Sequence, residues 1–203
     1  MSTPGPLICV VDDDASIRKS LLRLLQSAGH TAEAFESARM YLDRAIHAGP
    51  CCVVVDVLMP ELTGLDLQQQ LIARGRDEPI VFITGDGDIP ASVQAMKAGA
   101  VDFLPKPFKE EAFFDAVERA LARSREQRQQ RVEQEEARER LATLTPRERQ
   151  VLEGVIAGKM NKEIAADLGT AVRTVKIQRG SAMKKMAVAS VPALMRLVRR
   201  TES

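Results

Sequence analysis

The feature that most constrains the fold of this chain is an alternation of short apolar runs with helix-like segments over residues 1–122. Residues 7–11, 52–55 and 80–83 are apolar throughout, and the segments after them carry apolar residues at helical spacing. A fourth run at 100–104 and a weaker strand at 31–35 complete the pattern. Strands that are apolar on both faces lie in parallel sheets covered by helices on either side. The sequence therefore predicts an α/β fold with a five-stranded, parallel, doubly wound sheet.

A charged segment at 123–140 follows this α/β part. Arg, Glu and Gln dominate it, Val132 and Ala137 are nearly its only apolar residues, and no Gly or Pro interrupts it. These residue types are strong helix formers, but they offer no apolar face from which to build a core. We predict a long, solvated linker helix, with a flexible charged linker as the alternative.

Residues 141–203 show the pattern of an all-α domain of four helices. Thr145, Pro146 and Glu148 fit the start of the first helix as N-cap, first-turn proline and capping-box glutamate. Asn161 is the expected cap of a second helix that ends near Gly169. A third helix is predicted over residues 172–185, directly after a tight turn. Two short helices joined in this way, the second of them basic, form a helix-turn-helix pattern.

The fourth helix of this domain is predicted to begin near Ser190. Its apolar face consists of Leu194, Leu197 and Val198. This face is longer than a lone domain needs, so it could pair two copies of the chain. Packing within one copy is the alternative.

The net charge of +1 conceals an uneven distribution along the chain. Residues 1–122 carry 11 basic and 18 acidic side chains, whereas residues 141–203 carry 12 basic and 5 acidic ones. A basic final module favours nucleic acid as its partner, and the acidic first part needs a different one. The aromatic content of 3% and the lack of Trp argue against a stacking platform for single strands.

The sequence also indicates the compartment. No apolar run approaches the length of a membrane span, and the first residues lack a signal-peptide pattern. We therefore expect a cytoplasmic protein without a membrane partner. Cys9, Cys51 and Cys52 lack metal-ligand spacing, so we expect them to be reduced and buried.

Chemically reactive residues stand where the predicted strands end. Asp12, Asp13, Asp56, Thr84 and Lys106 all occupy such positions. The carboxyl ends of parallel strands meet at one edge of the sheet, where the sites of this fold class form. Clustered carboxylates repel one another unless a cation lies among them, and oxygen ligands of this kind suit Mg²⁺. A carboxylate beside Mg²⁺ can attack a phosphoryl group and form an aspartyl phosphate.

The motifs at these strand ends resemble those of the receiver domain of two-component response regulators. They are Val11-Asp12-Asp13-Asp14, Asp56-Val57-Leu58-Met59-Pro60 with Gly64, Ile83-Thr84-Gly85 and Lys106-Pro107-Phe108. The resemblance implies a flavodoxin-like receiver in which Asp56 accepts a phosphoryl group from a sensor histidine kinase. It further implies that Mg²⁺ is bound by Asp13, by Asp56 and by the backbone carbonyl of Leu58, with Asp12 acting through water.

The same resemblance implies a conformational switch. Thr84 and Lys106 would be the switch pair, and Phe103 would be the aromatic residue whose ring moves with Thr84. A cis peptide bond between Lys106 and Pro107 is expected as well. The nearby Asp86 is expected either to tune the lifetime of the phosphoryl group or to be a solvated loop charge.

Residues 141–203 carry a second set of motifs, which resemble the LuxR-type four-helix DNA-binding domain. They are Leu144-Thr145-Pro146-Arg147-Glu148-Arg149-Gln150-Val151-Leu152, Gly158-Lys159-Met160-Asn161-Lys162-Glu163-Ile164-Ala165 and Arg173-Thr174-Val175-Lys176. The two resemblances in this order are those of the FixJ/NarL class. They imply a receiver at 1–122, a linker at 123–140 and a DNA-binding domain at 141–203.

The third helix of the basic module would enter the major groove of DNA. By resemblance, the readers of base edges are Lys176, Ile177 and Arg179, residue types that suit guanine acceptors and a thymine methyl group. The residues better placed for phosphates, which position a protein without reading sequence, are Asn161, Lys162, Thr174 and Lys184.

Three residues depart from the family pattern in this helix. Gln178 stands where the family usually has His, and Ala171 stands where a capping Ser is usual, so the helix lacks a cap unless Thr170 substitutes. Gly180 weakens the helix interior, and it could also permit close approach to the DNA backbone.

The sequence thus predicts a regulator in which phosphorylation promotes dimerisation and binding to double-stranded promoter DNA, with transcription activation through RNA polymerase as the expected outcome. The residues argue against two other classes of protein. A Mg²⁺-dependent phosphatase generally needs an acid two residues after its nucleophile, where this chain has Leu58. A flavin- or nucleotide-binding module needs a glycine-rich loop after the first strand, which is missing.

Overall fold

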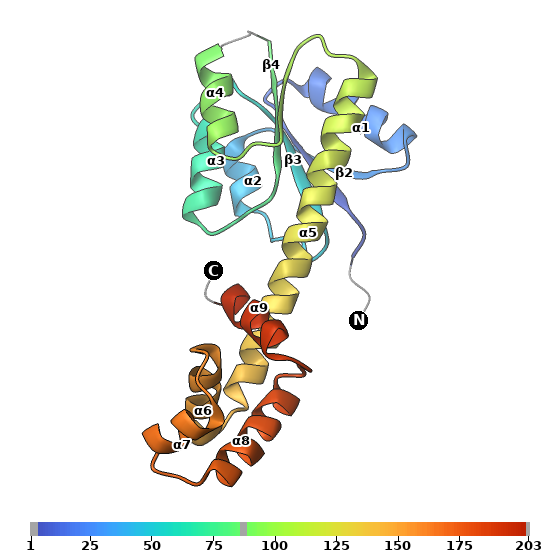
Figure 1. Ribbon diagram of the computed structural model, residues 1–203. Coiled ribbons are helices and arrows are strands. Elements are labelled where there is room, and N and C mark those ends of the chain that lie inside the picture. Colours follow the sequence, from blue (N-terminus) through green and yellow to red (C-terminus); the bar gives the residue numbers. More distant parts are fainter. Residues whose placement is uncertain (1–3, 86–88, 202–203) are drawn as a thin grey trace. The chain divides into compact units, whose positions relative to one another are not determined.

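The computed structural model describes residues 4–85 and 89–201. The chain forms two compact units, Met1–Arg128 and Gln129–Ser203, and the division falls inside one long helix, α5 (Glu110–Ala142) (Figure 1). The domain boundaries expected from the sequence, at residues 122 and 140, stay a prediction. Among the described helices, none is long and apolar enough to cross a membrane.

The first unit contains a five-stranded sheet in the order β2-β1-β3-β4-β5, and every pair of neighbouring strands is parallel. The strands are β1 (Leu7–Val11), β2 (Thr31–Phe35), β3 (Cys51–Asp56), β4 (Ile80–Thr84) and β5 (Asp102–Pro105). The predicted flavodoxin-like architecture is confirmed.

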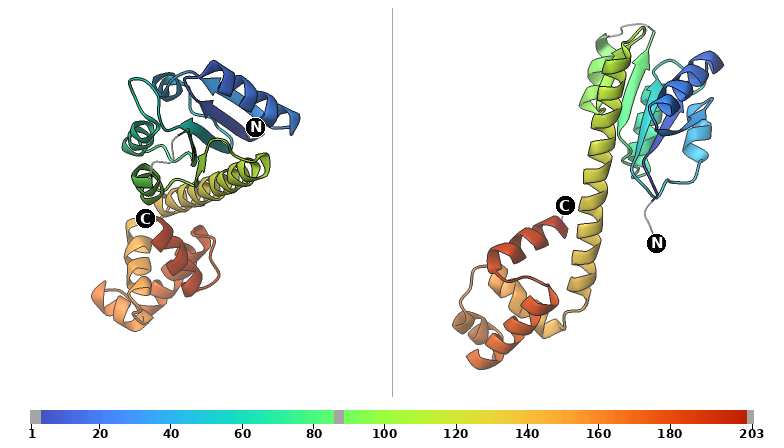
Figure 2. Two further views of the ribbon diagram at one scale, coloured as in Figure 1. Left: turned by 90° about the horizontal axis from the view of Figure 1, so that it is seen from above. Right: turned by 90° about the vertical axis from the view of Figure 1, so that its right-hand side faces the viewer.

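Helices cover both faces of this sheet, as Figures 1 and 2 show. They are α1 (Ala15–Ser27), α2 (Ala38–Asp43), α3 (Gly64–Ala73), α4 (Ile89–Lys97) and the first part of α5. One apolar core lies between the sheet and helices α2 to α4, and a second lies between the sheet and helices α1 and α5. Two cores on opposite faces explain why the strands are apolar throughout.

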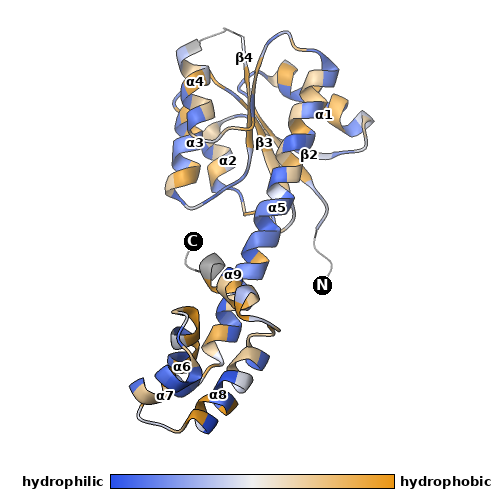
Figure 3. Ribbon diagram, viewed as in Figure 1, coloured by the Kyte–Doolittle hydropathy of each residue, from blue (hydrophilic) through white to orange (hydrophobic). Residues whose placement is uncertain are grey.

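The strand interiors account for much of both cores. Every residue of β1 and β4 is buried, and Figure 3 shows the hydrophobic colouring concentrated on the strands. The three cysteines are buried and form no disulfide, as the sequence predicts. Cys9 and Cys51 face each other with their sulfur atoms 3.9 Å apart.

Helix α5 continues beyond the sheet as one uninterrupted helix, so the charged segment is helical and not a flexible linker. Hydrophilic residues dominate its exposed part in Figure 3. Pairs one helical turn apart stabilise this surface, among them Arg140 with Glu136 at 3.0 Å.

The described part of the second unit contains four further helices, α6 (Pro146–Ile156), α7 (Asn161–Asp167), α8 (Val172–Lys185) and α9 (Val191–Thr201). Thr145 caps α6, and Glu148 closes a capping box with it, as predicted. The expectation that Asn161 caps α7 is wrong. Met160 is the N-cap, its amide donates to Glu163 at 2.6 Å, and Asn161 is the first helical residue.

The apolar face of α9 is used within one copy of the chain. Leu194 is fully buried, and Leu197 and Val198 pack against the same core, which α6, α7 and α8 complete. The structure thus supports packing of this face within one copy of the chain.

Candidate functional site

The acidic edge of the first unit is built by strand register. Asp12 directly follows β1, Asp56 is the last residue of β3, and Thr84 is the last residue of β4. Because β1, β3 and β4 are parallel and in register, all of these residues lie at the same carboxyl edge. Lys106 reaches the edge from the loop after β5, whose last residue pairs with Thr84.

Lys106 connects two of the acidic side chains directly. Its ammonium donates hydrogen bonds to Oδ2 of Asp56 at 2.9 Å and to Oδ2 of Asp12 at 3.0 Å. Asp13 offers a third carboxylate, and one oxygen of each acid lies within 4.8 Å of the others. The structure thus brings together three acids and the lysine that the sequence places at different strand ends.

The three acids differ in their access to solvent. Asp12 is fully buried, Asp56 is partly exposed, and Asp13 is exposed. Burial raises the pKa of Asp12 above its usual value, although its hydrogen bond from Lys106 opposes this rise. Burial by itself would lower the pKa of Lys106, but the hydrogen bonds to Asp56 and Asp12 outweigh it and raise that pKa.

Backbone groups hold the acids in place. The amide of Asp14 donates to Asp12 at 2.8 Å, and the amide of Leu58 donates to Oδ1 of Asp56 at 3.3 Å. The side chain of Arg18 donates to the carbonyls of Asp12 and of Asp13, at 2.8 and 2.9 Å. These hydrogen bonds hold the loop after β1, and none of them involves the carboxylate of Asp13.

Gly64, the first residue of α3, packs against the backbone of Asp56. A Cβ atom at this position would lie 2.3 Å from the carbonyl oxygen of Asp56. The amide of Gly64 also donates to the carbonyl of Val57 at 2.9 Å. Only a residue without a side chain lets α3 start this close to β3.

The predicted switch residues Thr84 and Phe103 lie on the two strands β4 and β5, and Thr84 ends β4 at the same edge as the acids. Thr84 is buried, and its carbonyl accepts a hydrogen bond from the amide of Lys106 at 2.6 Å. Phe103 on β5 is half-buried, with its ring centroid 6.0 Å from that of Phe82. The peptide bond between Lys106 and Pro107 is cis, as expected. The expectation for Asp86 falls outside the described residues.

The donor set fits a hard divalent cation. Asp12, Asp13 and Asp56 offer carboxylate oxygens only, and the described residues place no sulfur or imidazole ligand among them. Mg²⁺ prefers oxygen ligands and keeps several waters, so a partly exposed site with two or three carboxylates suits it. The carbonyl of Leu58 as a further ligand stays a prediction.

Helices α7 and α8 form the helix-turn-helix of the second unit. The turn runs through Gly169, which has φ +60, and the amide of Thr170 donates back to the carbonyl of Ala165 at 2.9 Å. The left-handed conformation at this turn favours glycine. Helix α8 then presents Lys176 and Ile177 to solvent, and Ile177 is 64% exposed.

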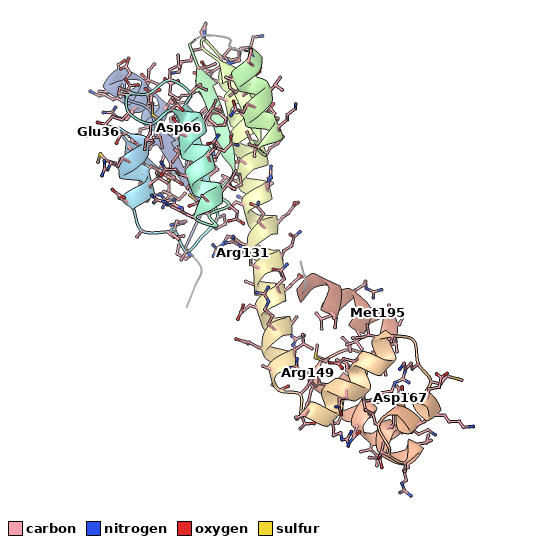
Figure 4. The ribbon with its side chains drawn as sticks, turned by 90° about the vertical axis from the view of Figure 1, so that its left-hand side faces the viewer. Glu36, Asp66, Arg131, Arg149, Asp167 and Met195 are labelled. Atoms are coloured by element: carbon pink, nitrogen blue, oxygen red, sulfur yellow. The ribbon has the colours of Figure 1, made fainter. Side chains whose placement is uncertain are left out.

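The other predicted DNA contacts are divided between exposed and restrained residues. Lys162 and Lys184 are exposed, and Thr174 is half-buried. Arg179 donates a hydrogen bond from Nη1 to Oδ1 of Asn161 at 2.9 Å, so these two predicted contacts bind each other. Figure 4 shows Asp167 at the end of α7. Its Oδ2 atom lies 2.7 Å from Nζ of Lys159, so the two side chains form an ion pair.

The three departures in α8 have distinct structural settings. Ala171 is the N-cap and makes no side-chain capping bond, so Thr170 does not replace the missing cap. The side-chain oxygen of Gln178 is buried and has no hydrogen-bond partner among the described residues. Gly180 faces open space, so packing does not require a glycine there.

The sequence does not predict the hydrogen bonds of Arg18 to the loop after β1 or the close approach of Gly64 to β3. Arg18 binds backbone carbonyls, and such contacts leave no recognisable spacing in a sequence. The start of α3 did carry a signal, since Thr63 and Asp66 form a capping box around Gly64. Figure 4 shows Asp66 on this helix.

Comparisons with known proteins agree with both units. The family described as "Response regulator receiver domain" matches residues 8–118, and the family described as "Bacterial regulatory proteins, luxR family" matches residues 142–198. This chain belongs to the two-component response regulators of the FixJ/NarL class, with a receiver domain followed by a LuxR-type DNA-binding domain.

Individual relatives cover nearly the whole chain. The transcriptional regulatory protein FixJ of Azorhizobium caulinodans is 45% identical over 93% of this chain and 89% of its own length. The response regulator protein TodT of Pseudomonas putida is 41% identical over 98% of this chain and 88% of its own. The low-resolution structure of the response regulator StyR is 46% identical, has a TM-score of 0.83, and covers 97% of this chain and all of that one.

Proposed function

We propose that Asp56 is the phosphoryl acceptor of this response regulator and that a sensor histidine kinase is the donor. The observation that carries the proposal is the hydrogen bond between Lys106 and Asp56, because it places a fixed positive charge beside a partly exposed carboxylate. An acceptor needs both an accessible oxygen and nearby cations to offset the added phosphoryl charge.

The transfer needs few groups. A carboxylate oxygen of Asp56 attacks the phosphorus atom of a phosphohistidine, the P–N bond breaks, and the imidazole leaves with the bonding electrons. Lys106 neutralises charge on the phosphoryl oxygens. The hydroxyl of the buried Thr84 donates a hydrogen bond to one of these oxygens. Asp13, Asp56 and the carbonyl of Leu58 would hold Mg²⁺, with Asp12 binding through water; when bound, the ion offsets the charge of the phosphoryl oxygens.

An apolar hollow beside Lys106 supports a protein donor. Its volume is about 540 Å³, and it is lined by Ile17, Ser20, Leu21, Leu24, Lys106, Pro107, Phe108 and Glu110. The hollow lies between α1 and the loop after β5, next to the acidic edge. A kinase helix that presents a phosphohistidine could pack its apolar side there while the imidazole reaches Asp56.

The output proposed for the second unit is binding to double-stranded promoter DNA as a homodimer after phosphorylation. Support comes from the basic charge of residues 141–203 and from the exposed Lys176 and Ile177 on α8. Phe103 would report the phosphorylated state by moving with Thr84. Transcription activation, contact with RNA polymerase and a cytoplasmic location complete the proposal, with functional domains at 1–122, 123–140 and 141–203.

The test uses a small phosphodonor, acetyl phosphate, with Mg²⁺ and the full-length chain. Intact mass and oligomeric state are followed for the wild type, for Asp56→Asn and for a control, Asp115→Asn, which changes an exposed acid on α5. One phosphoryl group should be added to the wild type and to the control but not to Asp56→Asn. Modification of Asp56→Asn at the wild-type rate would refute the assignment.

The same experiment distinguishes a regulator from a phosphatase. A regulator takes up one phosphoryl group per chain and releases it slowly, whereas a phosphatase turns over a phosphate ester continuously. We propose the former, because Leu58 stands where such enzymes place an acid. Sustained hydrolysis of p-nitrophenyl phosphate would instead favour the assignment as a phosphatase.

A further inference from the structure

We propose that Asn161 is a positioning residue for DNA recognition, and that it presents the guanidinium of Arg179 to a base edge instead of binding a phosphate itself. The proposal rests on the DNA-binding function proposed above. It changes the role that the sequence assigns to Asn161 and links the two helices of the helix-turn-helix through one hydrogen bond.

The geometry carries this assignment. Asn161 is the first residue of α7, and Arg179 lies in the middle of α8, 18 positions later. Nη1 of Arg179 donates to Oδ1 of Asn161 at 2.9 Å, and both side chains are half-buried. The side-chain oxygen of Asn161 is therefore directed at the arginine.

The hydrogen bond leaves Arg179 able to bind a base. A guanidinium has five N–H donors in a planar fork, and a bidentate contact to guanine O6 and N7 uses two of them. One donor held by Asn161 leaves enough for such a contact. Arg179 also borders a hollow of about 360 Å³ with Lys176 and Gly180, so a partner can approach it.

Restraint of the arginine has a clear thermodynamic benefit. An unrestrained arginine loses much rotamer freedom when it binds, whereas a side chain already held in its bound orientation loses less. Lys176 and Ile177 on the same helix are exposed, and no hydrogen bond holds the Lys176 side chain among those described for this unit. Arg179 is thus the best preorganised of the three predicted base readers, and Asn161 provides the preorganisation.

The test measures sequence discrimination by the full-length protein after treatment with acetyl phosphate and Mg²⁺. A preferred duplex is first selected from a random library with the wild type, and affinity is then compared on that duplex and on a scrambled duplex. The variants are Asn161→Ala, Arg179→Ala, the double variant, and Lys162→Ala as a matched control. Lys162 is the exposed neighbour of Asn161 on α7.

Arg179→Ala should lower the ratio of specific to nonspecific affinity about tenfold. Asn161→Ala should lower this ratio by several-fold, roughly half of that effect on a logarithmic scale, and the double variant should be no worse than Arg179→Ala, because the two residues act as one unit. Lys162→Ala should weaken binding to both duplexes equally. Asn161→Asp retains the acceptor oxygen and should keep the wild-type ratio while binding all DNA more weakly.

Two results would overturn the proposal. Asn161→Ala could behave like Lys162→Ala, which would make Asn161 a phosphate contact, or its effect could multiply with that of Arg179→Ala, which would make the two independent. Wild-type affinity for scrambled DNA in Asn161→Ala shows that folding is intact. Failure of the wild type to enrich any sequence would instead refute the proposed sequence-specific function.

Discussion

The ammonium of Lys106 lies 2.9 Å from Oδ2 of Asp56 and 3.0 Å from Oδ2 of Asp12, so one cation offsets charge on two strand ends at once. Asp12 is fully buried, and Lys106 is its only ion-pair partner among the described residues. This arrangement makes the lysine part of the stability of the acidic edge as well as of its proposed chemistry.

Lys106→Met should therefore destabilise the first unit in Mg²⁺-free buffer by about 1.5–3 kcal/mol, the range for hydrogen bonds to charged groups. Added Mg²⁺ should restore more stability to this variant than to the wild type, because it supplies the missing positive charge. Thermal unfolding with and without Mg²⁺ measures both effects. Lys109→Met, at an exposed lysine close by, is the control and should change neither. Equal Mg²⁺ responses in all three proteins would contradict the prediction.

Asp13 and Asp14 offer a matched pair for testing metal binding. Both are exposed, but Asp13 belongs to the acidic cluster, whereas Asp14 caps α1 and accepts from the amide of Ser16 at 2.7 Å. Asp13→Asn should weaken Mg²⁺ binding at least about tenfold. Loss of a residue that only hydrogen-bonds to a metal ligand already lowers metal affinity by about this factor. Asp14→Asn keeps a good cap and should leave affinity unchanged. Titration calorimetry measures the Mg²⁺ affinity of both variants. An equal loss of affinity in the two variants would show that Asp13 is not a Mg²⁺ ligand.

Much of the fold follows from the sequence because its signals are local. Four apolar runs and one weaker segment predict five strands, and the boundaries of β1, β2 and α8 match the predicted ones. Helix α2 was not predicted, since it has only six residues, too few for a periodic pattern. The acids of the edge were predicted together because parallel strands share a carboxyl end. The hydrogen bond from Arg179 to Asn161 does not follow from the sequence, because it depends on how two helices cross.

Gly64 and Gly180 should respond in opposite ways to the same substitution. Alanine at position 64 would place Cβ 2.3 Å from the carbonyl oxygen of Asp56, so the backbone has to shift, and we expect a loss of about 1–3 kcal/mol together with slower phosphorylation. Alanine at position 180 meets nothing within 4 Å and should stabilise α8 by about 0.5–1 kcal/mol. Chemical denaturation measures both.

Gly180→Ala also tests whether the glycine serves DNA binding. If the absence of a side chain permits close approach to the DNA backbone, the variant should be more stable and yet bind DNA more weakly. Unchanged affinity together with higher stability would leave Gly180 without a role in binding.

Ala171→Ser should stabilise the recognition helix. Ala171 occupies the N-cap of α8 with φ −77 and ψ 145, a conformation suited to a capping serine, but it makes no side-chain capping bond. A capping side chain contributes about 1 kcal/mol, so the melting temperature of this unit should rise by about 4–8 °C. Ala166→Ser, at an exposed position inside α7, is the control and should not stabilise. No rise in Ala171→Ser would show that the turn cannot accept the cap.

Glu148 should make the stability of the second unit depend on pH. Its carboxylate accepts hydrogen bonds from Lys185 at 2.6 Å, from Ser181 and from the amide of Thr145, and these interactions lower its pKa to about 2. A group whose pKa is lower in the folded state contributes stability above its unfolded pKa and loses it as the pH falls. The contribution should thus be complete above pH 4.5, the ordinary value, and disappear towards pH 2.

The measurement compares the unfolding free energy of the wild type with that of Glu148→Gln across this range, since other acids titrate in both proteins and cancel in the difference. The difference should be largest near neutral pH and shrink steadily below pH 4.5. Glu153→Gln, at an exposed acid on the same helix, is the control and should follow the wild type. A constant difference across the range would mean that Glu148 acts as a hydrogen-bonding cap only, and that the charge of Lys185 contributes nothing to holding α6 against α8.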